Sequence, residues 1–576
     1  MSFKDRISIE FFRRQLANVD ALPQLVVIAV GVGLLTGAVI ISFRLGIDIL
    51  LFQLLGNEPE NFEALSIMSR VLLLLIGGAL IGALMHWFSA SERRTGVVHV
   101  MERLSLHQGY LPLKSAALQF VGGIVGLVSG QSGGREGPAI HLGAATASGF
   151  GQLFKLPNNS MRTLIACGTA AAIASSFNTP IAGVIFAMEV VMMEYSIASF
   201  LPVIVAAVCS TFLTQLVFGS QPAFNVVSAD LSSLSELPFV ILVGLLTGCV
   251  AAAFIRLVQL FASLSHWPFF VRALLAASIT AVGAVWVPQV MGIGYDTVDS
   301  AMVGAIALQT LVLITIVKTI ASAAATGLGI PVGLIGPTFV IGAALGGALS
   351  ILGHQYGGTE PNSALYVTLG MAAMMAAVLQ APLAALMAVL EMTANPNVIP
   401  TAMLVIVVAT LVTSQVFRQK SVFLSTLNTL GLDYPPSPVK LHLQKAGVVS
   451  IMNREFSRSE LAVSREAATK TLAANPTWVV VEDADRVHCI LNAGDLRAFL
   501  DERDDLEDGI ELLRLPGERK DVVEIDSRAT VQEAQEALSA GSAEACIVRR
   551  LTAPMIRPVV GIITKDDISR YRQVIE

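Results

Sequence analysis

Long uncharged runs recur through the first three quarters of the chain. The first covers residues 25–43 and is close to the roughly 20 residues with which a helix crosses about 30 Å of hydrocarbon. Comparable runs begin near Val71, Phe200, Leu237, Leu274, Val303 and Met403. Only 30 of the 80 charged residues lie at positions 21–437. The sequence therefore predicts a polytopic all-α membrane protein and excludes a fibrous, disordered or disulfide-framework chain.

A second set of apolar runs is short and is broken by glycine or proline. These runs cover 138–154, 164–176, 180–191, 337–352 and 382–390. We expect them to be too short to cross the bilayer straight. Irregular backbone at membrane depth is stable only inside protein or beside water, so helices that stop partway predict an internal site lined by their ends.

An internal repeat relates the two halves of this apolar region. The sequence GREGP at 134–138 matches GLIGP at 333–337 with an offset of 199. At an offset of 202, NTPIA at 178–182 matches QAPLA at 380–384, and Glu189 matches Glu391. Repeats of this kind place the substrate site at mid-membrane, where the halves meet. The spacing alone leaves open whether the repeat is inverted or parallel.

The charge distribution divides the chain into three parts. We expect a cytoplasmic amino-terminal segment at 1–21, a membrane domain at 22–435 with halves at 22–220 and 237–435, and a soluble domain at 436–576. In the soluble part, β-branched runs at 478–481 and 487–491 precede a helix that opens at Asp495, and runs at 545–548 and 559–563 precede one near Asp566. The pattern predicts a small α/β domain of two βαββα units, joined by an acidic linker at 501–508.

Both repeat copies place a glycine and a proline at the start of a helix, at 137–138 and 336–337. A helix start carries unpaired N–H groups and about half a positive charge, so it binds anions. Two such starts aimed at one mid-membrane point stabilise a dehydrated anion without a fixed full charge that would trap it. The sequence thus favours an anion as the transported solute.

Glu136 is an acid at membrane depth, beside one of these helix starts. Burying an acid there costs about 2.5–3.5 kcal/mol even on the mild insertion scale. As a carboxylate it can occupy the place of the anion and block the path, and protonation or displacement lets the anion in. This hypothesis predicts pH- or voltage-dependent gating. The alternative is that Glu136 only caps its helix or pairs with Arg135.

With these motifs, the whole chain resembles the CLC family of chloride channels and chloride/proton exchangers. The resemblance implies an inverted repeat of tilted and broken helices, a homodimer with a separate anion pathway in each subunit, and Glu136 as the gating glutamate. Backbone N–H groups of Leu334 and Ile335 are implied at the central anion site. The full set of implied anion-binding residues is Thr95, Gly96, Arg135, Glu136, Gly137, Leu334, Ile335 and Phe423.

Several of these positions depart from the family pattern. Thr95, within RTGVV at 94–98, takes the place of the serine in the family's Gly-Ser-Gly-Ile-Pro motif, so a hydroxyl is kept while the proline is lost. Ile335 takes the place of a usual phenylalanine, and Phe423 that of the pore tyrosine. At Phe423 the hydroxyl that the family places at the inner anion contact is therefore missing.

Val190 is the departure that bears on mechanism. In exchangers of this family, the second of two adjacent acids relays protons from the cytoplasm, and Val190 stands at that position. Because valine carries no proton, the sequence favours a passive, gated chloride channel. A chloride/proton antiporter that uses Glu189, Glu194 or a water chain is the alternative. The match of Glu189 to Glu391 indicates that both are structural acids at helix ends.

The tail resembles a pair of CBS modules. Thr564 and Asp567 place a hydroxyl and an acid three residues apart at a helix start, where CBS pairs hydrogen-bond the ribose of adenosine nucleotides, and Asn492 and Asp495 stand in the corresponding places of the first module. An adenosine nucleotide is therefore the one cofactor expected, and it is not required for transport. In the alternative, the pair serves only as a dimer contact.

The remaining expectations concern partners and location. Scattered histidines and cysteines predict no metal site, and the chain is expected to be no enzyme. A net charge of −6 gives no reason to propose a nucleic acid. We expect chloride or a related anion, protons, membrane lipid and a second subunit as partners. Arg418 and Lys420, next to the soluble tail, place the carboxyl end in the cytoplasm by the positive-inside rule. The even number of crossings implied by the resemblance puts the amino end there too, and we expect a multi-pass protein of a bacterial inner membrane. A secondary transporter of another solute and a membrane sensor with a silent pore stay as distant alternatives.

Overall fold

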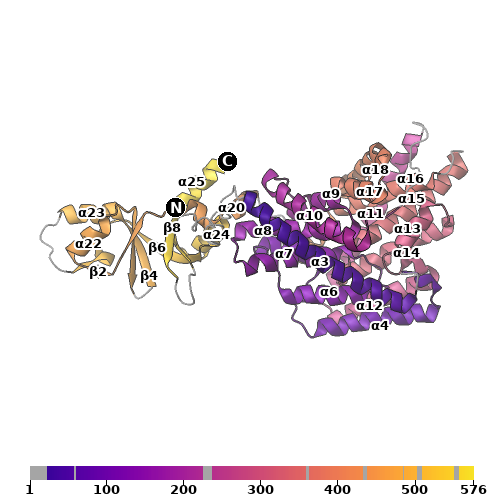
Figure 1. Ribbon diagram of the computed structural model, residues 1–576, viewed down its shortest axis with the longest axis horizontal. Coiled ribbons are helices and arrows are strands. Elements are labelled where there is room, and N and C mark those ends of the chain that lie inside the picture. Colours follow the sequence, from indigo (N-terminus) through magenta and orange to yellow (C-terminus); the bar gives the residue numbers. More distant parts are fainter. Residues whose placement is uncertain are drawn as a thin grey trace. The chain divides into compact units, whose positions relative to one another are not determined.

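The structure is a computed structural model that describes residues 22–56, 60–224, 236–357, 362–432, 438–483, 486–502, 509–550 and 557–575. The chain forms two compact units, drawn in Figure 1: the larger comprises Leu25–Phe154 and Met161–Pro435, and the smaller is built mainly from Pro436–Glu576 together with Lys155–Ser160. The expected amino-terminal segment at 1–21, the boundary at 435–436 and most of the acidic linker lie outside the described residues.

Eight helices within the described ranges are long and apolar enough to cross a membrane. They are α3 (Leu22–Leu55), α4 (Ile67–His86), α10 (Ile197–Phe218), α11 (Leu237–Ala262), α12 (Phe269–Trp286), α14 (Leu308–Gly327), α15 (Ile335–Gly357) and α18 (Ile399–Leu411) with its π-helical extension η7 (Val412–Val416). The expected polytopic helical fold is confirmed. One span predicted to begin near Val303 begins instead at Leu308, because Gly304 with φ +70° interrupts the chain after α13 (Tyr295–Met302).

One prediction about the broken helices was wrong, and two apolar helices were missed. The run at 337–352 belongs to α15, a continuous helix of 23 residues, because Pro337 lies in its first turn, where the missing N–H breaks no hydrogen bond. Two apolar helices were not predicted, α6 (Leu113–Val128) and α16 (Ser363–Leu379). Their 16 and 17 residues fall short of a full span, so a search for long runs passes over them.

The larger unit contains the same succession of helices twice. The first half has α5 (Gly96–Leu106), α6, α7 (Glu136–Leu153), α8 (Asn158–Phe177), α9 (Pro180–Phe186) with its π-helical extension η2 (Ala187–Met192), and α10; the second has α13, α14, α15, α16, α17 (Pro382–Thr393) and α18. In the first half α5 and α6 pack on α7, and in the second α13 and α14 pack on α15. The unit ends at α19 (Val422–Thr429).

The smaller unit is the predicted pair of βαββα modules. The first consists of β1 (Phe456–Ser459), α22 (Arg465–Leu472), β3 (Trp478–Asp483), β4 (Arg486–Asn492) and α23 (Ala493–Glu502), and the second of β6 (Arg519–Asp526), α24 (Val531–Ala540), β7 (Ala545–Arg549), β8 (Val559–Thr564) and α25 (Lys565–Ile575). One sheet runs through both in the order β1-β3-β4-β6-β7-β8. Short elements complete the unit: α20 (Pro438–Lys445), α21 (Val448–Ile451), β2 (Ala462–Val463) and β5 (Ile510–Glu511).

The modules match in pairing as well as in order. β1 lies parallel to β3 and β6 parallel to β7, while β3–β4 and β7–β8 are antiparallel.

Helix α23 begins at Ala493 rather than at the predicted Asp495. The Asn492 side chain accepts the Gly494 N–H at 2.8 Å and so turns the chain two residues earlier.

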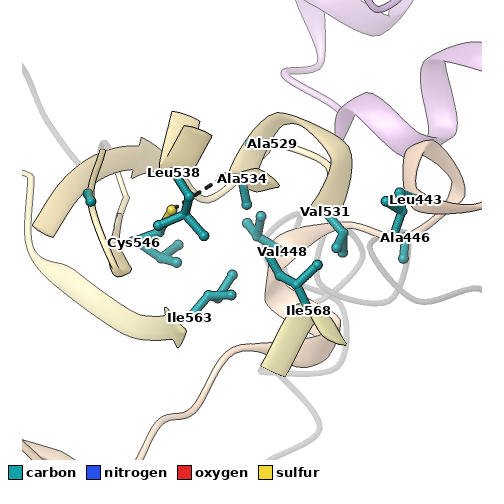
Figure 2. Close-up of a cluster of buried hydrophobic side chains, with 12 residues drawn as sticks. Leu443, Ala446, Val448, Ala529, Val531, Ala534, Leu538, Cys546, Ile563 and Ile568 are labelled. Atoms are coloured by element: carbon teal, nitrogen blue, oxygen red, sulfur yellow. Dashed lines mark hydrogen bonds between the residues drawn. The ribbon is translucent and has the colours of Figure 1, made fainter. Parts of the chain in front are cut away.

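A separate apolar core lies in each module. Figure 2 shows the core of the second, in which Val448, Val531, Leu538, Cys546 and Ile563 are labelled within a cluster of twelve buried residues. The Cys546 thiol donates to Ala534 O at 3.6 Å, and burial raises its pKa to about 12. A thiol with so high a pKa is unreactive at neutral pH, so Cys546 acts as a packing residue.

Candidate anion site

The two repeated glycine-rich loops pair with each other. Gly134 N–H donates to Gly333 O at 2.7 Å, and Gly333 N–H donates to Gly134 O at 2.6 Å, in an antiparallel bridge. A Cβ atom on Gly137 would lie 2.7 Å from Gly333 Cα, so only glycine permits this approach. Because α7 and α15 begin within three residues of the bridge, it brings the two helix starts together, as the repeat predicted.

The Glu136 carboxylate lies on the start of the opposite helix. Its Oε2 atom accepts the Gly336 N–H of α15 at 3.0 Å, and its Oε1 atom accepts the Tyr295 hydroxyl at 2.9 Å. The side chain has no exposed surface. A backbone N–H at a helix start is the group that binds an anion, so the carboxylate occupies a position suited to one.

A cavity of about 540 Å³ lies between the helices on one side of this carboxylate. Six of the eight residues implied by the resemblance line it: Thr95, Gly96, Gly137, Leu334, Ile335 and Phe423. Arg135 and Glu136 are not among its lining residues, and Glu136 is fully buried. Residues that the resemblance implied, from the region of α5, α7, α15 and α19, therefore meet at one cavity although they lie up to about 330 positions apart in the chain.

Gly96 is engaged differently from the expectation of an anion contact. Its N–H donates to Gln119 Oε1 at 2.8 Å, and His141 Nδ1 lies 3.2 Å away. The Thr95 side chain makes no capping hydrogen bond to α5, and Thr95 lines the cavity together with Arg94 of the same motif. Gly96 contributes to the shape of the cavity, while its N–H serves the Gln119 side chain.

Arginines that were not predicted also line the cavity. Arg93, Arg94 and Arg272 are among its lining residues, and Arg94 forms an ion pair with Glu102. Arg272 donates to Leu328 O at 3.1 Å and stacks over Phe269 at 4.9 Å. Positive charge along a cleft raises the local concentration of anions. Arg93 and Arg94 are adjacent and Arg272 lies far from them in the sequence, so no spacing pattern predicts that the three meet at one cavity.

Arg135 lies next to Glu136 in the sequence and is not among the residues that line the cavity. Its guanidinium carbon lies 5.9 Å from the Phe177 ring centroid and 5.8 Å from that of Tyr295. Its Nε atom has no hydrogen-bond partner among the described residues. The alternative in which Glu136 pairs directly with Arg135 is not what the geometry shows, because the carboxylate is bonded to Tyr295 and Gly336.

Glu189 and Glu391 cap helices of each other's repeat. Glu189 accepts the N–H groups of Leu383 at 3.3 Å and Ala384 at 2.7 Å, at the start of α17. Glu391 accepts those of Ile181 at 3.0 Å and Ala182 at 2.7 Å, at the start of α9. The reciprocal bonding gives both acids a structural role, as their matching positions indicated.

Val190 lies in the π-helical turn that continues α9, and it is 5% exposed. Between this helix and the anion site lies a void of only about 10 Å³, lined by eleven residues that include Ile335, Phe186 and Ala384, and of these only Thr179 is polar. A void of this size holds one water at most. The surroundings of the void between Val190's helix and Ile335 are therefore apolar.

In the tail, Thr564 and Asp567 bond to each other. Asp567 Oδ2 accepts both the Thr564 N–H at 2.9 Å and the Thr564 hydroxyl at 2.7 Å, and the Asp567 N–H donates to Thr564 Oγ1 at 3.3 Å. This arrangement is a reciprocal cap at the start of α25. In the first module, Asp495 Oδ2 accepts the Glu518 N–H at 2.8 Å.

A helical membrane domain whose two repeats bring paired helix starts onto one buried carboxylate defines a membrane transport protein for anions. Residues 77–414 match the family described as voltage gated chloride channel, and the chain belongs to this family. Its members are channels or transporters, not enzymes. The protein is a multi-pass CLC anion transport protein.

Individual relatives show the same membership. The chain is 30% identical over 376 residues to a putative chloride channel protein ClcB-like from Ralstonia nicotianae, over 63% of this chain and 87% of the relative. It is 25% identical over 613 residues to chloride channel protein CLC-f from Arabidopsis thaliana, over 99% of this chain and 72% of the relative. The crystal structure of a slow cyanobacterial Cl⁻/H⁺ antiporter superposes with a TM-score of 0.63 at 24% identity, over 71% of this chain and 98% of that one.

Proposed function

We propose that the protein is a passive, gated chloride channel in which Glu136 is the gate. The observation that carries this proposal is the bonding of the acids around the inner proton-relay position. Val190 replaces one acid, and Glu189 beside it is held by two N–H groups at the start of α17. A proton relay needs a titratable group that can change partners, and these residues do not supply one.

The apolar surroundings add support. The void between Ile335 and Phe186 has room for one water at most, so it does not hold a chain of waters. The cavity that reaches Ile335, by contrast, has about 540 Å³ and three arginines. On this side a wide cavity with arginines reaches Ile335, one of the proposed anion ligands, whereas the void toward Phe186 is small and apolar.

In liposomes containing the purified protein, a chloride gradient is expected to drive chloride flux without uphill proton movement. The measurement is radioactive chloride uptake with simultaneous recording of external pH. Liposomes without protein give the background, and a proton ionophore added at the end gives the maximal pH signal. Proton movement against its gradient at a fixed ratio to chloride contradicts the channel and establishes the alternative, a chloride/proton antiporter with another inner path.

We also propose a homodimer with cytoplasmic termini in a bacterial inner membrane. The support for orientation is the pair of basic residues Arg418 and Lys420, which follow the last spanning helix and precede the tail. Chloride is the proposed anion, and the hydroxyl of Thr95 and the N–H groups of Leu334 and Ile335 are its proposed ligands, with Phe423 at the inner side.

For the tail, we propose Thr564, Asp567 and Asp495 as candidate contacts of an adenosine nucleotide. Thr564→Ala is expected to destabilise the tail by about 1 kcal/mol, since the Asp567 N–H loses its side-chain acceptor. Differential scanning calorimetry of the full-length protein measures this loss, and Thr564→Ser, which keeps the hydroxyl, is the control.

The same variants test the nucleotide. Heat of binding with ATP, ADP or AMP in the wild type, lost in Thr564→Ala and kept in Thr564→Ser, supports the assignment. Absence of heat with all three retires Thr564 and Asp567 as ligands and leaves the tail as a dimer contact.

A further inference from the structure

The residue that completes the environment of Glu136 is Tyr295, the first residue of α13. The Tyr295 hydroxyl donates to Glu136 Oε1 at 2.9 Å, while Gly336 N–H donates to Oε2 at 3.0 Å. Each carboxylate oxygen thus has a donor from the second repeat. The backbone donor cannot be altered by substitution, whereas the phenol can.

The repeat explains why a side chain from α13 reaches this point. Helix α13 begins at Tyr295 and α5 begins at Gly96, 199 positions earlier, which is the offset that relates Gly134 to Gly333. The start of α5 borders the anion cavity. The start of α13, in the second repeat, approaches the Glu136 carboxylate of the first. Its first residue, Tyr295, carries a phenol where its counterpart Gly96 has only a hydrogen atom.

The Tyr295 ring is fixed by aromatic neighbours. Phe224 meets it edge-on with centroids 5.6 Å apart, and Phe177 lies at 6.3 Å. The Arg135 guanidinium lies 5.8 Å from its centroid. A phenol held in this way gives its hydroxyl one position, so little entropy is lost when it bonds Glu136.

The backbone before Tyr295 is fixed as well. Gly294 has φ +87°, a conformation that favours glycine. The fully buried Lys318 of α14 points its ammonium group at the carbonyls of Gln289, Val290 and Gly292, at 3.3–3.4 Å. The turn that delivers the phenol is therefore tied to a neighbouring helix.

We propose that Tyr295 is a positioning residue that latches the Glu136 carboxylate on the start of α15 and so sets the pH at which the gate opens. The latch rests on the proposed gating role of Glu136. A donor to the ionised carboxylate stabilises it in the blocking position, and protonation of Glu136 removes the charge that strengthens this bond. The charged groups that act on Glu136 or on the phenol are Arg135, Arg44 and Glu60, and a change at Tyr295 leaves all three in place.

Tyr295→Phe removes the hydroxyl and keeps every ring contact. In liposomes with the full-length protein, chloride flux at pH 7.5 is expected to rise about tenfold, and the pH of half-maximal flux to rise by about one unit. Tyr366→Phe is the matched control, because that phenol also donates to a carboxylate, that of Glu236, at a distance of 3.1 Å. Neither Tyr366 nor Glu236 is bonded to Glu136. The control variant is expected to leave the pH profile unchanged.

A double variant separates the latch from the gate. In Glu136→Ala, flux is expected to be independent of pH, and adding Tyr295→Phe is expected to change nothing further. A pH-independent Glu136→Ala together with a wild-type profile in Tyr295→Phe overturns the latch and leaves the gate standing. An effect of Tyr295→Phe that persists without Glu136 also overturns the latch. A wild-type pH profile in Glu136→Ala overturns the gate itself, and the latch with it. Melting temperatures of all variants show that each one folds.

Discussion

Glu136→Gln is expected to raise chloride flux at neutral pH by about 10–100-fold and to remove its pH dependence. The carboxylate is held by a charge-assisted bond to the Gly336 N–H at 3.0 Å, and such a bond is worth about 1.5–3 kcal/mol. The amide of glutamine lacks the charge and competes weakly with chloride for the helix start. Because each 1.4 kcal/mol is tenfold in an equilibrium, the open state gains accordingly.

The sign of the pH effect follows from the same geometry. In the wild type, acidification protonates the carboxylate, weakens its hold on α15 and increases flux. In Glu136→Gln no group at this position titrates, so the profile is flat and lies at the level of the acid-activated wild type. Flux measured from pH 4.5 to 8 in liposomes tests this, with Glu236→Gln as a control at a buried acid whose partner is Tyr366. An unchanged pH profile in Glu136→Gln would sink the gating role.

Much of the membrane domain could be predicted from the sequence because its pattern is one-dimensional. Uncharged runs give the spanning helices, and the recurrence of GREGP as GLIGP gives the repeat. The repeat in turn predicted that two helix starts meet, and the bridge between Gly134 and Gly333 confirms it. The helices α6 and α16 were missed, because their 16 and 17 residues are shorter than the runs by which spanning helices are found.

The partners of Glu136 could not be predicted in the same way. Tyr295 reaches Glu136 across 159 positions, and a tyrosine at a helix start in an apolar region is ordinary in composition. Arg93 and Arg272 meet at the cavity only after α4, α5 and α12 pack. Contacts of this kind depend on the packing of whole helices, which single-residue patterns do not encode.

Glu189→Ala and Glu391→Ala are expected to have equal effects on stability and none on ion coupling. Each acid accepts two N–H groups at the start of a helix in the other repeat. Removal leaves those N–H groups without a side-chain acceptor, which costs about 1–3 kcal/mol at half-buried positions. The melting temperature of the purified protein is expected to fall in both variants. Because the two caps share no partner, the double variant is expected to lose the sum of the two.

Equal effects of Glu189→Ala and Glu391→Ala distinguish a helix-capping role of Glu189 from a proton-relay role. Glu189 borders the relay position at Val190, whereas Glu391 is its counterpart in the other repeat and has no place on that path. If Glu189 carried protons, its alanine variant would alter the ratio of proton to chloride movement while Glu391→Ala left it alone. Similar losses of stability with unchanged flux ratios assign both acids to the junction between α9 and α17. The repeat then explains both acids by symmetry, and Glu136 is left as the acid whose titration controls the proposed anion route.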